Sequence, residues 1–308
     1  MSTMQSLYKW FYGKCSAEVA AVFRIATGTL VFLHILYICK YIQPFFTDTG
    51  YLSHTVAQQL SWAPKFSLLF FVGTPWVVYL LFVVMSVSCL LYIVGIYSQW
   101  MSLLTYVLFI SFFNRFPVSS YAGTHLCTVA LFFGAFLQSD RAFTPQWYRL
   151  RNPTLSSVPG WPLRMIQLQL CVIYLIAAIS KVQSYTWWNG TELLYVLNSH
   201  HSIFNFTWLQ WHPNFVAIGS YFAMFAELLF PILIWYPSLR RTCLIMISLL
   251  HIGIALTMHV TYFSETMLAL LTSFLLTEDL TWVRNIRKSL PSRGRVNKNR
   301  MLNMISLK

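Results

Sequence analysis

The stretch AVFRIATGTLVFLHILYIC, residues 21–39, decides the fold class of this chain. It has about the length of the roughly 20 apolar residues that cross a bilayer as a helix, and it lacks the small-residue cleavage site of a signal peptide. The remainder of the chain has the same character, because 57% of its 308 residues are hydrophobic and only 9% are charged. A soluble domain carries about a quarter charged residues. The composition therefore predicts an all-α integral membrane protein and excludes a soluble enzyme, a disordered chain and a disulfide scaffold.

Further apolar stretches follow the first, and together they predict about eight transmembrane helices. The predicted spans cover residues 18–39, 75–97, 99–114, 124–138, 164–181, 216–236, 242–260 and 264–277. The third and fourth are short for a full crossing. Pro75 is expected in the first turn of its helix, and Pro237 is expected to end the sixth span.

The basic residues predict the orientation of these spans. Lys and Arg concentrate in segments that share one side if the N-terminus is cytoplasmic: 1–17, 139–164, 240–241 and the tail. The opposite side holds only Lys40, Lys65, Arg115 and Lys181, each near a helix end. This asymmetry follows the positive-inside rule, so the net charge of +13 indicates topology and membrane lipid rather than a nucleic acid partner. The predicted organisation is a cytoplasmic amphipathic segment at 1–17, a membrane domain at 18–278 and a basic cytoplasmic tail at 279–308.

The longest external loop, residues 182–214, is rich in Trp, Tyr and Phe. Aromatic amphipathic segments settle at the membrane interface. The sequence therefore predicts an interfacial or re-entrant segment between spans five and six, built of short helices that cover the outer ends of the bundle.

Several ionisable residues lie at membrane depth, where each costs roughly 2.5–3.5 kcal/mol on insertion scales and needs a partner or a function. They are Arg24, His34, His125, Lys181, Glu227, His251, His259 and Glu265. With the predicted topology, most of them fall in the outer leaflet.

Each of these residues also has a structural interpretation. Lys181 at the end of a span is compatible with a side chain that reaches up to the interface. His34 and His251 are compatible with buried histidines bonded to the backbone, and Glu265 with an acid at a helix N-terminus. Glu227 is compatible with an ion pair to Arg24. The functional interpretation is a shared site, in which an apolar recess favours the neutral amine of Lys181 and makes it a general base for a lipophilic substrate with an acidic proton, such as a phenol or hydroquinone.

Three motifs resemble the HTTM domain family, the membrane module of vitamin K-dependent gamma-glutamyl carboxylases and their bacterial relatives. The first is Tyr174-Leu-Ile-Ala-Ala-Ile-Ser-Lys181 followed by Trp187-Trp188-Asn189-Gly190. The second is Asn114-Arg-Phe-Pro117 with Thr124-His125 and Asp140, and the third is Leu250-His-Ile-Gly-Ile-Ala-Leu-Thr-Met258. The resemblance covers about residues 18–278.

The resemblance implies a catalytic role for Lys181 as the base that deprotonates a reduced vitamin K or menaquinone, with His125 assisting. In the carboxylases the quinol then reacts with oxygen to give a strong base, and carbon dioxide traps the carbanion of a substrate Glu. His34, His259, Glu265 and Glu227 are the expected supporting polar residues. Trp187 and Trp188 are the expected cofactor-binding residues, and no metal is expected.

This sequence departs from the carboxylase pattern at two positions, where Ser180 replaces a Lys and Thr124 replaces an Asn. We also expect no counterpart, within these 308 residues, of the large extramembrane domain that presents protein substrates in animal carboxylases. The chain resembles small bacterial HTTM proteins as well, including the membrane component that matures a sporulation-delaying peptide.

Three hypotheses stay open: a carboxylase-like membrane enzyme that uses a lipid-soluble quinol, a non-carboxylating factor for maturation or export of a secreted peptide or protein precursor, and a lipid-binding membrane protein without chemistry. The expected location is the bacterial inner membrane, or the ER membrane in a eukaryotic host, with both termini in the cytoplasm.

Overall fold

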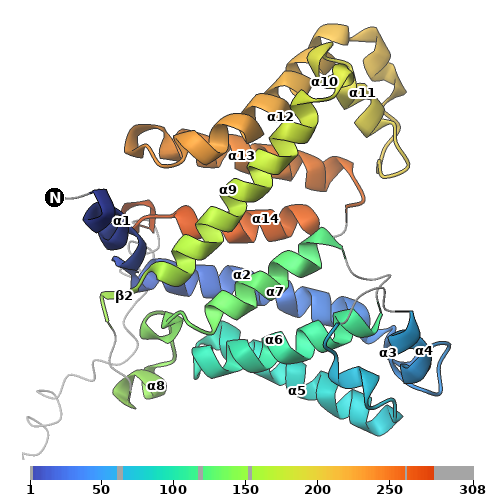
Figure 1. Ribbon diagram of the computed structural model, residues 1–308, viewed down its shortest axis with the longest axis vertical. Helices are drawn as coiled ribbons and strands as arrows, with labels where there is room; N and C mark the ends of the chain where they lie inside the picture. The colour runs from blue at the N-terminus through green and yellow to red at the C-terminus, as the bar shows by residue number, and fades with distance from the viewer. Residues whose placement is uncertain (1–2, 61–64, 117–120, 152–154, 261, 281–308) are drawn as a thin grey trace, which may run out of the picture.

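A computed structural model describes residues 3–60, 65–116, 121–151, 155–260 and 262–280 (Figure 1). The predicted basic tail from residue 281 onward and Pro117 of the second motif lie outside these ranges. The described chain is mostly helical, with one two-stranded sheet in which β1 (Lys14–Ser16) pairs antiparallel with β2 (Ser157–Pro159).

A helix occupies each of the eight predicted stretches. These helices are α2 (Ala17–Cys39), α5 (Pro75–Val94), α6 (Ser98–Arg115), α7 (Ala122–Gly134), α9 (Trp161–Val182), α12 (Pro213–Leu233), α13 (Pro237–Thr257) and α14 (Phe263–Leu271). Five of them, α2, α5, α9, α12 and α13, are long and apolar enough to cross a membrane. α7 and α14 are shorter, and α6 carries Ser, Gln and Asn among its apolar residues. The structure thus supports five spans, and the count of eight stays a prediction.

Prolines begin α5, α12 and α13, and two of these prolines were singled out in the sequence. α5 begins at Pro75, as predicted, since a first-turn proline lacks only an N–H that would have no partner within the helix. Pro237 was expected to end the sixth span, but it is the first residue of α13. The same property explains the difference, because a proline that cannot continue one helix can begin the next.

Short helices form most of the connections. They are α1 (Thr3–Tyr12), α3 (Ile42–Phe46), α4 (His54–Gln59), η1 (Leu68–Phe70), η3 (Ser139–Arg141), α8 (Gln146–Arg151), α10 (Tyr185–Trp188), α11 (Glu192–Leu197), η4 (Thr207–Trp211), η5 (Thr272–Phe274) and η6 (Thr277–Leu280). The aromatic loop contributes α10, α11 and η4, which pack on α12. Its expected division into short helices is therefore found, whereas its depth in a membrane stays a prediction.

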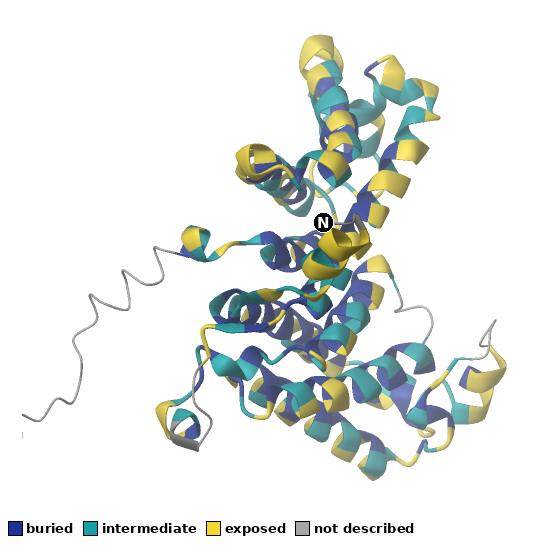
Figure 2. Ribbon diagram, turned by 60° about the vertical axis from the view of Figure 1, so that its left-hand side comes forward, coloured by how far each residue is buried: buried dark blue, intermediate teal, exposed yellow. Residues whose placement is uncertain are grey.

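The helix α2 links two hydrophobic cores. Its first half, Ala17 to Phe23, packs with α7, α9, α12, α13 and α14, while its second half, Leu30 to Ile38, packs with α3, α5 and α6. Residues on the outward faces of the other helices are exposed (Figure 2), as expected of helices whose outer faces contact lipid.

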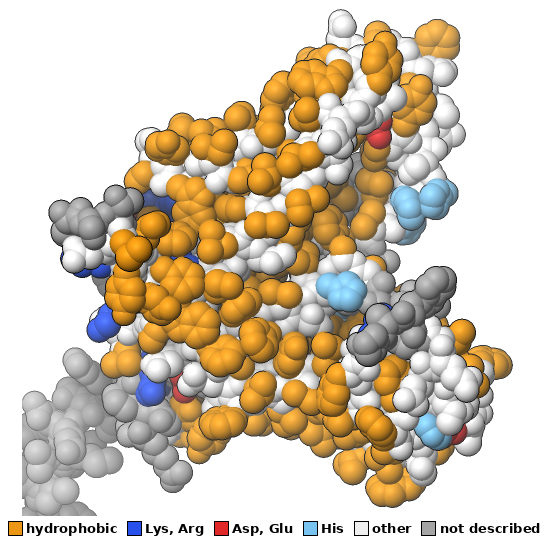
Figure 3. Space-filling model, in the orientation of Figure 1, with side chains coloured by type: hydrophobic (Ala, Val, Ile, Leu, Met, Phe, Trp, Pro, Cys, Tyr) orange, Lys and Arg blue, Asp and Glu red, His pale blue; other side chains and the backbone are white. Residues whose placement is uncertain are grey.

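The two ends of the bundle differ in charge. Lys and Arg gather at the end that holds the N-terminus, histidines lie at the opposite end, and apolar side chains cover the face between them (Figure 3). This separation agrees with the charge asymmetry of the sequence. The direction of insertion stays a prediction.

Candidate functional site

Lys181 and Glu227 form an ion pair between two packed helices. Lys181 lies in the last turn of α9, and Glu227 lies in the middle of α12, which packs along α9 (Figure 1). The Lys181 Nζ is 2.5 Å from the Glu227 Oε2, and the two side chains are 19% and 10% exposed. A basic residue is favourable at a helix C-terminus, where the carbonyls have no helical partners. The alternative pairing of Glu227 with Arg24 is wrong.

Arg24 instead binds backbone carbonyls. Its side chain is fully buried in α2 and donates hydrogen bonds to the carbonyl oxygens of Ser139, Ala142 and Phe143. These carbonyls bind the two terminal nitrogens of the guanidinium, while the Glu227 carboxylate pairs with Lys181.

The two predicted cofactor-binding tryptophans have different surroundings. The Lys181 Nζ lies 5.1 Å from the centre of the Trp187 ring, within the range of a cation–π contact. Trp188 is half-exposed, and its indole N–H donates to the carbonyl of Val182 at 2.6 Å, which caps the end of α9. Trp187 therefore belongs to the surroundings of the amine, and Trp188 holds the start of the aromatic loop.

Lys181 and Glu227 open onto an apolar cavity of about 570 Å³, which we call the Lys181 pocket. Its walls come from α11, η4, α12 and α13, and include Trp187, Leu193, Phe206, Trp208, Phe222, Leu250, Gly253 and Met258. Lys181 and Glu227 are its only ionisable lining residues among the described positions. A cavity of this size, apolar with a few convergent polar groups, is typical of sites for small molecules.

Gly253 leaves part of this pocket open. A Cβ built on Gly253 would have no atom within 4 Å, apart from the helix's own backbone. A side chain at this position would therefore extend into free space, so Gly253 provides a position at which the cavity can be filled.

A buried phenol and imidazole lie on the helices that carry the pocket. The Tyr174 hydroxyl is 2.9 Å from the His251 Nε2, and both side chains are almost completely buried. Tyr174 lies seven residues before Lys181 on α9, which places the two on the same face of the helix. The sequence interpretation offered a core role for His251 and named Tyr174 only as the first residue of the Lys181 motif, although this spacing was the available signal for a role of its own.

Three of the predicted supporting residues, His34, His259 and Glu265, gather at a second location. His259, Tyr262 and Glu265 line a smaller cavity of about 250 Å³ with Tyr37, which we call the Tyr262 pocket. The ring of the buried His34 packs against the Tyr262 ring in a tilted arrangement, with 4.1 Å between ring centres. Its Nε2 is 3.0 Å from the Tyr121 hydroxyl. Met258 lines both pockets, which makes them neighbours.

His125 lies in the first turn of α7 and is exposed. Among the described lining residues of the Lys181 and Tyr262 pockets, His125 is absent. The structure therefore brings Glu227 and Trp187 to Lys181, whereas the partnership of His125 with Lys181 stays a prediction.

The described residues contain no group of three His, Cys, Asp or Glu side chains that could hold a metal ion. The candidate chemistry is instead that of an amine and a carboxylate at the wall of an apolar cavity.

Comparison with protein-family models identifies an HTTM domain over residues 12–279. The match covers most of the chain, which therefore belongs to the HTTM domain family. The HTTM domain is a membrane module associated with vitamin K-dependent carboxylases, and the apolar helices agree with an integral membrane protein. No curated protein and no solved structure matches the chain.

Proposed function

We propose that this protein is a carboxylase-like membrane enzyme in which the Lys181–Glu227 pair accepts the acidic proton of a lipid-soluble quinol. The observation that carries the proposal is the position of this pair, at 2.5 Å, on the wall of a 570 Å³ apolar cavity. A buried charged pair is a poor source of stability, because desolvation opposes the attraction between its members. Ionisable groups at membrane depth more often serve a function.

The proton balance of the pair suits this role. Lys181 and Glu227 together carry no net charge when they share one proton in the contact between Nζ and Oε2. They can take up a second proton, which gives an ammonium beside a neutral carboxylic acid. The positive charge then stabilises a phenolate in the cavity, where the low dielectric strengthens the attraction.

The cavity also suits a quinol in shape. Trp187, Phe206, Trp208 and Phe222 offer aromatic faces for a quinol ring, and the apolar walls offer room for an isoprenoid tail. Reduced menaquinone or vitamin K is the cofactor that this proposal names, and by analogy with the carboxylases the quinol supplies a strong base after reaction with oxygen. Carbon dioxide is required only if the protein carboxylates a substrate. Under the proposal Glu227 is the direct partner of Lys181, and His125 assists from α7.

The test is formation of quinone epoxide by the purified protein with reduced menaquinone and oxygen. We expect Lys181→Ala to abolish turnover. We expect Gly253→Leu to abolish it as well, because the new side chain extends into the cavity without touching the ion pair. Gly253→Ala is the matched control and should keep most of the activity, since a methyl group takes up little of the space.

Turnover of Lys181→Ala equal to that of the wild type would exclude Lys181 as the base. Loss of turnover in His125→Gln, with the fold intact, would support the assisting role of His125.

A second candidate function is maturation or export of a secreted peptide, and the aromatic loop favours it. Tyr185, Tyr195, Trp208 and Trp211 have more than half of their surface exposed, and Trp208 also lines the Lys181 pocket. An exposed aromatic surface of this kind can receive an amphipathic peptide. A precursor peptide whose mature mass changes when this protein is deleted, together with no epoxide formation, would favour this candidate. Quinol that co-purifies but is never converted would indicate a lipid-binding protein without chemistry.

A further inference from the structure

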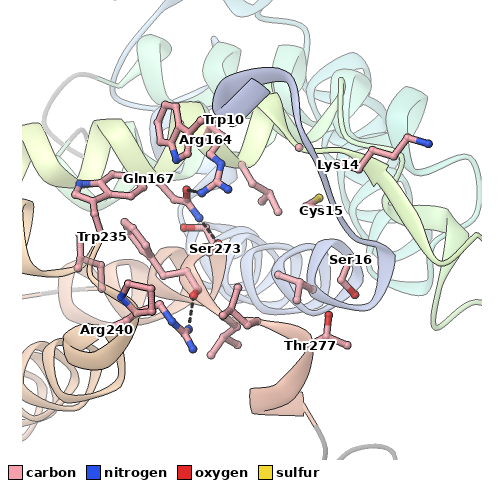
Figure 4. A pocket seen from close by; sticks show the side chains of 18 residues that line it. Trp10, Lys14, Cys15, Ser16, Arg164, Gln167, Trp235, Arg240, Ser273 and Thr277 are labelled. Atoms are coloured by element: carbon pink, nitrogen blue, oxygen red, sulfur yellow. Dashed lines mark hydrogen bonds between the residues drawn. The ribbon is translucent and has the colours of Figure 1, made fainter. Parts of the chain in front are cut away.

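A separate cavity of about 480 Å³ opens at the opposite end of the bundle, where the N-terminus and the basic residues lie (Figures 3 and 4). We call it the Arg164 pocket. It is lined by residues of α1, β1, α9, α13 and the segment around η5, among them Trp10, Lys14, Arg164, Gln167, Arg240 and Ser273. It shares no described lining residue with the Lys181 pocket, so it is a different site.

The charges that line the Arg164 pocket are positive. Lys14, Arg164 and Arg240 contribute to its described wall, and no acidic residue does. Arg240 is balanced by Asp279, whose Oδ2 lies 2.8 Å from the Arg240 Nη1. Arg164 bonds instead to the neutral amide of Gln167 at 2.8 Å and lies 5.0 Å from the centre of the Trp10 ring. Neither contact neutralises its charge, so the pocket carries a net positive charge.

Three helix N-termini line the pocket; those of α9 and α13 add to this positive charge, whereas Glu18 in the first turn of α2 offsets that of α2. Ser16 precedes α2, Gly160 precedes α9 and Pro237 begins α13, and all three residues line the pocket. None of the three helices has a side-chain hydrogen bond at its N-cap. The first N–H groups of a helix and its dipole favour an anion.

The C-terminal end of η5, which follows α14, also lies at this pocket, and its negative carbonyl ends would repel an anion, but these carbonyls already have hydrogen-bond donors. The carbonyls of Ser273 and Phe274, after the end of α14, accept hydrogen bonds from Gln167 and Arg240 at 2.6 and 2.8 Å. The carbonyl dipoles of this segment are therefore compensated by protein donors. The Cys15 thiol adds no negative charge, because burial raises its pKa to about 11 although Arg164 lowers it in part.

Two buried polar atoms at the wall have no partner in the described structure. They are the Ser273 Oγ, in a residue that is 2% exposed, and the Arg240 Nε, in a residue that is 8% exposed. Buried polar groups without a partner cost free energy, so a ligand with hydrogen-bonding atoms would be favoured beside the Ser273 Oγ and the Arg240 Nε. In Figure 4, Arg164 and Arg240 lie on two sides of the pocket with Gln167 and Ser273 between them.

We propose that the Arg164 pocket binds a phosphate-bearing anion, with Arg164 as its main ligand and Lys14 at the rim. Guanidinium groups bind phosphate oxygens through paired hydrogen bonds, and basic pockets between membrane helices bind lipid head groups. Trp10 and Trp235, whose rings are 5.3 Å apart, suit the depth of a head group. The chain's own segment 281–308 is not a complementary occupant, because it contains basic but no acidic residues.

The test measures binding to the full-length purified protein in a neutral detergent. Phosphatidylglycerol, phosphatidylcholine and inorganic phosphate are the three probes, with native mass spectrometry for the lipids and a thermal unfolding midpoint for all three. We expect phosphatidylglycerol to bind and stabilise the wild type. We expect Arg164→Gln to weaken this binding by about tenfold, the effect of losing one charged hydrogen bond, and Arg164→Lys to restore part of it.

Additional variants and competition between probes identify the source of the anion and control for effects on folding. Lys14→Gln, at an exposed rim position, should weaken binding less than Arg164→Gln. Lys9→Gln, on the exposed surface of the same N-terminal segment, is the matched control and should bind as the wild type does.

Stabilisation by inorganic phosphate that Arg164→Gln abolishes would indicate a soluble phosphate ligand. Binding of phosphatidylglycerol that inorganic phosphate does not displace would indicate a lipid. The proposal is overturned if phosphatidylcholine binds as well as phosphatidylglycerol and phosphate has no effect, or if Arg164→Gln and Lys14→Gln both bind like the wild type.

Discussion

Arg24 and Lys181 are both cations within apolar helices, and the protein surrounds them in opposite ways. Arg24 is fully buried, and three carbonyls of one turn accept its hydrogen bonds. Lys181 keeps 19% of its side chain exposed, pairs with a carboxylate and faces an open cavity. Lys181 lines a cavity of about 570 Å³, whereas Arg24 lines none of the three pockets described above. A charge inside an apolar helix therefore indicates chemistry only when a cavity accompanies it.

The strongest test of this comparison is removal of the Arg24 guanidinium. Arg24→Leu leaves the carbonyls of the 139–143 turn without donors inside the bundle, so we expect a loss of roughly 3–5 kcal/mol or failure to fold. Thermal unfolding in detergent measures the loss. Arg241→Gln, at a side chain that is 62% exposed, is the control and should change the midpoint little.

A double-mutant cycle at Lys181 and Glu227 should give a different pattern. Each of Lys181→Met and Glu227→Gln leaves one buried group without its partner, and we expect each to cost about 2–4 kcal/mol. The double variant should cost less than the sum, because it removes both members of the pair. Unfolding free energies measure this coupling. Epoxide formation should stay absent in the double variant even where its stability recovers. If the losses of unfolding free energy in the two single variants simply add in the double variant, the two groups do not interact as the 2.5 Å contact indicates.

Two glycines test the difference in packing: Gly95 contacts Arg24, and Gly253 lines the same pocket as Lys181. Gly95 has φ +86°, and a Cβ there would lie 2.5 Å from the Arg24 Nη1, so we expect Gly95→Ala to destabilise the protein by about 2 kcal/mol or more. Gly253 has open space, so Gly253→Ala should stabilise α13 by about 0.5–1 kcal/mol. Unfolding midpoints of the two variants should move in opposite directions. A shift of both in the same direction would contradict the difference in packing.

The smallest expected effect on stability concerns Arg240, which binds a backbone carbonyl as Arg24 does and a carboxylate as Lys181 does. Its Nη1 donates to the carbonyl of Phe274 and to the carboxylate of Asp279, each at 2.8 Å. Burial raises the pKa of Asp279, but hydrogen bonds from Arg240, Arg241 and the N–H of Leu276 outweigh this effect and hold the pKa below its ordinary value.

The direction of the pH effect follows from this lowered pKa. The folded state holds the Asp279 proton less tightly than the unfolded chain does, so the contribution to stability is complete above the unfolded pKa of about 3.9 and is lost as the pH falls through the lower folded pKa. Between pH 6 and pH 3 the unfolding free energy should therefore fall less in Asp279→Asn than in the wild type. We expect the difference between the two falls to be below about 1 kcal/mol. Equal slopes would show that the contact with Arg240 does not stabilise the charged carboxylate.

The sequence was sufficient to predict the positions of the eight helices, because the length of an apolar stretch is a local property, although the role of Pro237 as the start of α13 was not predicted. It also singled out Lys181 and Glu227, since ionisable residues stand out in apolar runs. It was not sufficient to predict that they pair, because they are 46 positions apart and the contact depends on how α9 packs on α12. The same limit explains the wrong pairing of Glu227 with Arg24, whose partners lie in a turn 115 or more positions away.

The distance along the chain between Arg24 and its carbonyl partners has a consequence for biogenesis. Ser139 is synthesised 115 residues after Arg24, which takes roughly 6–23 seconds at ribosomal rates of about 5–20 residues per second. During that interval α2 carries a guanidinium whose final carbonyl partners do not yet exist. We therefore expect α2 to reach its final packing only after the segment 139–143 has been synthesised.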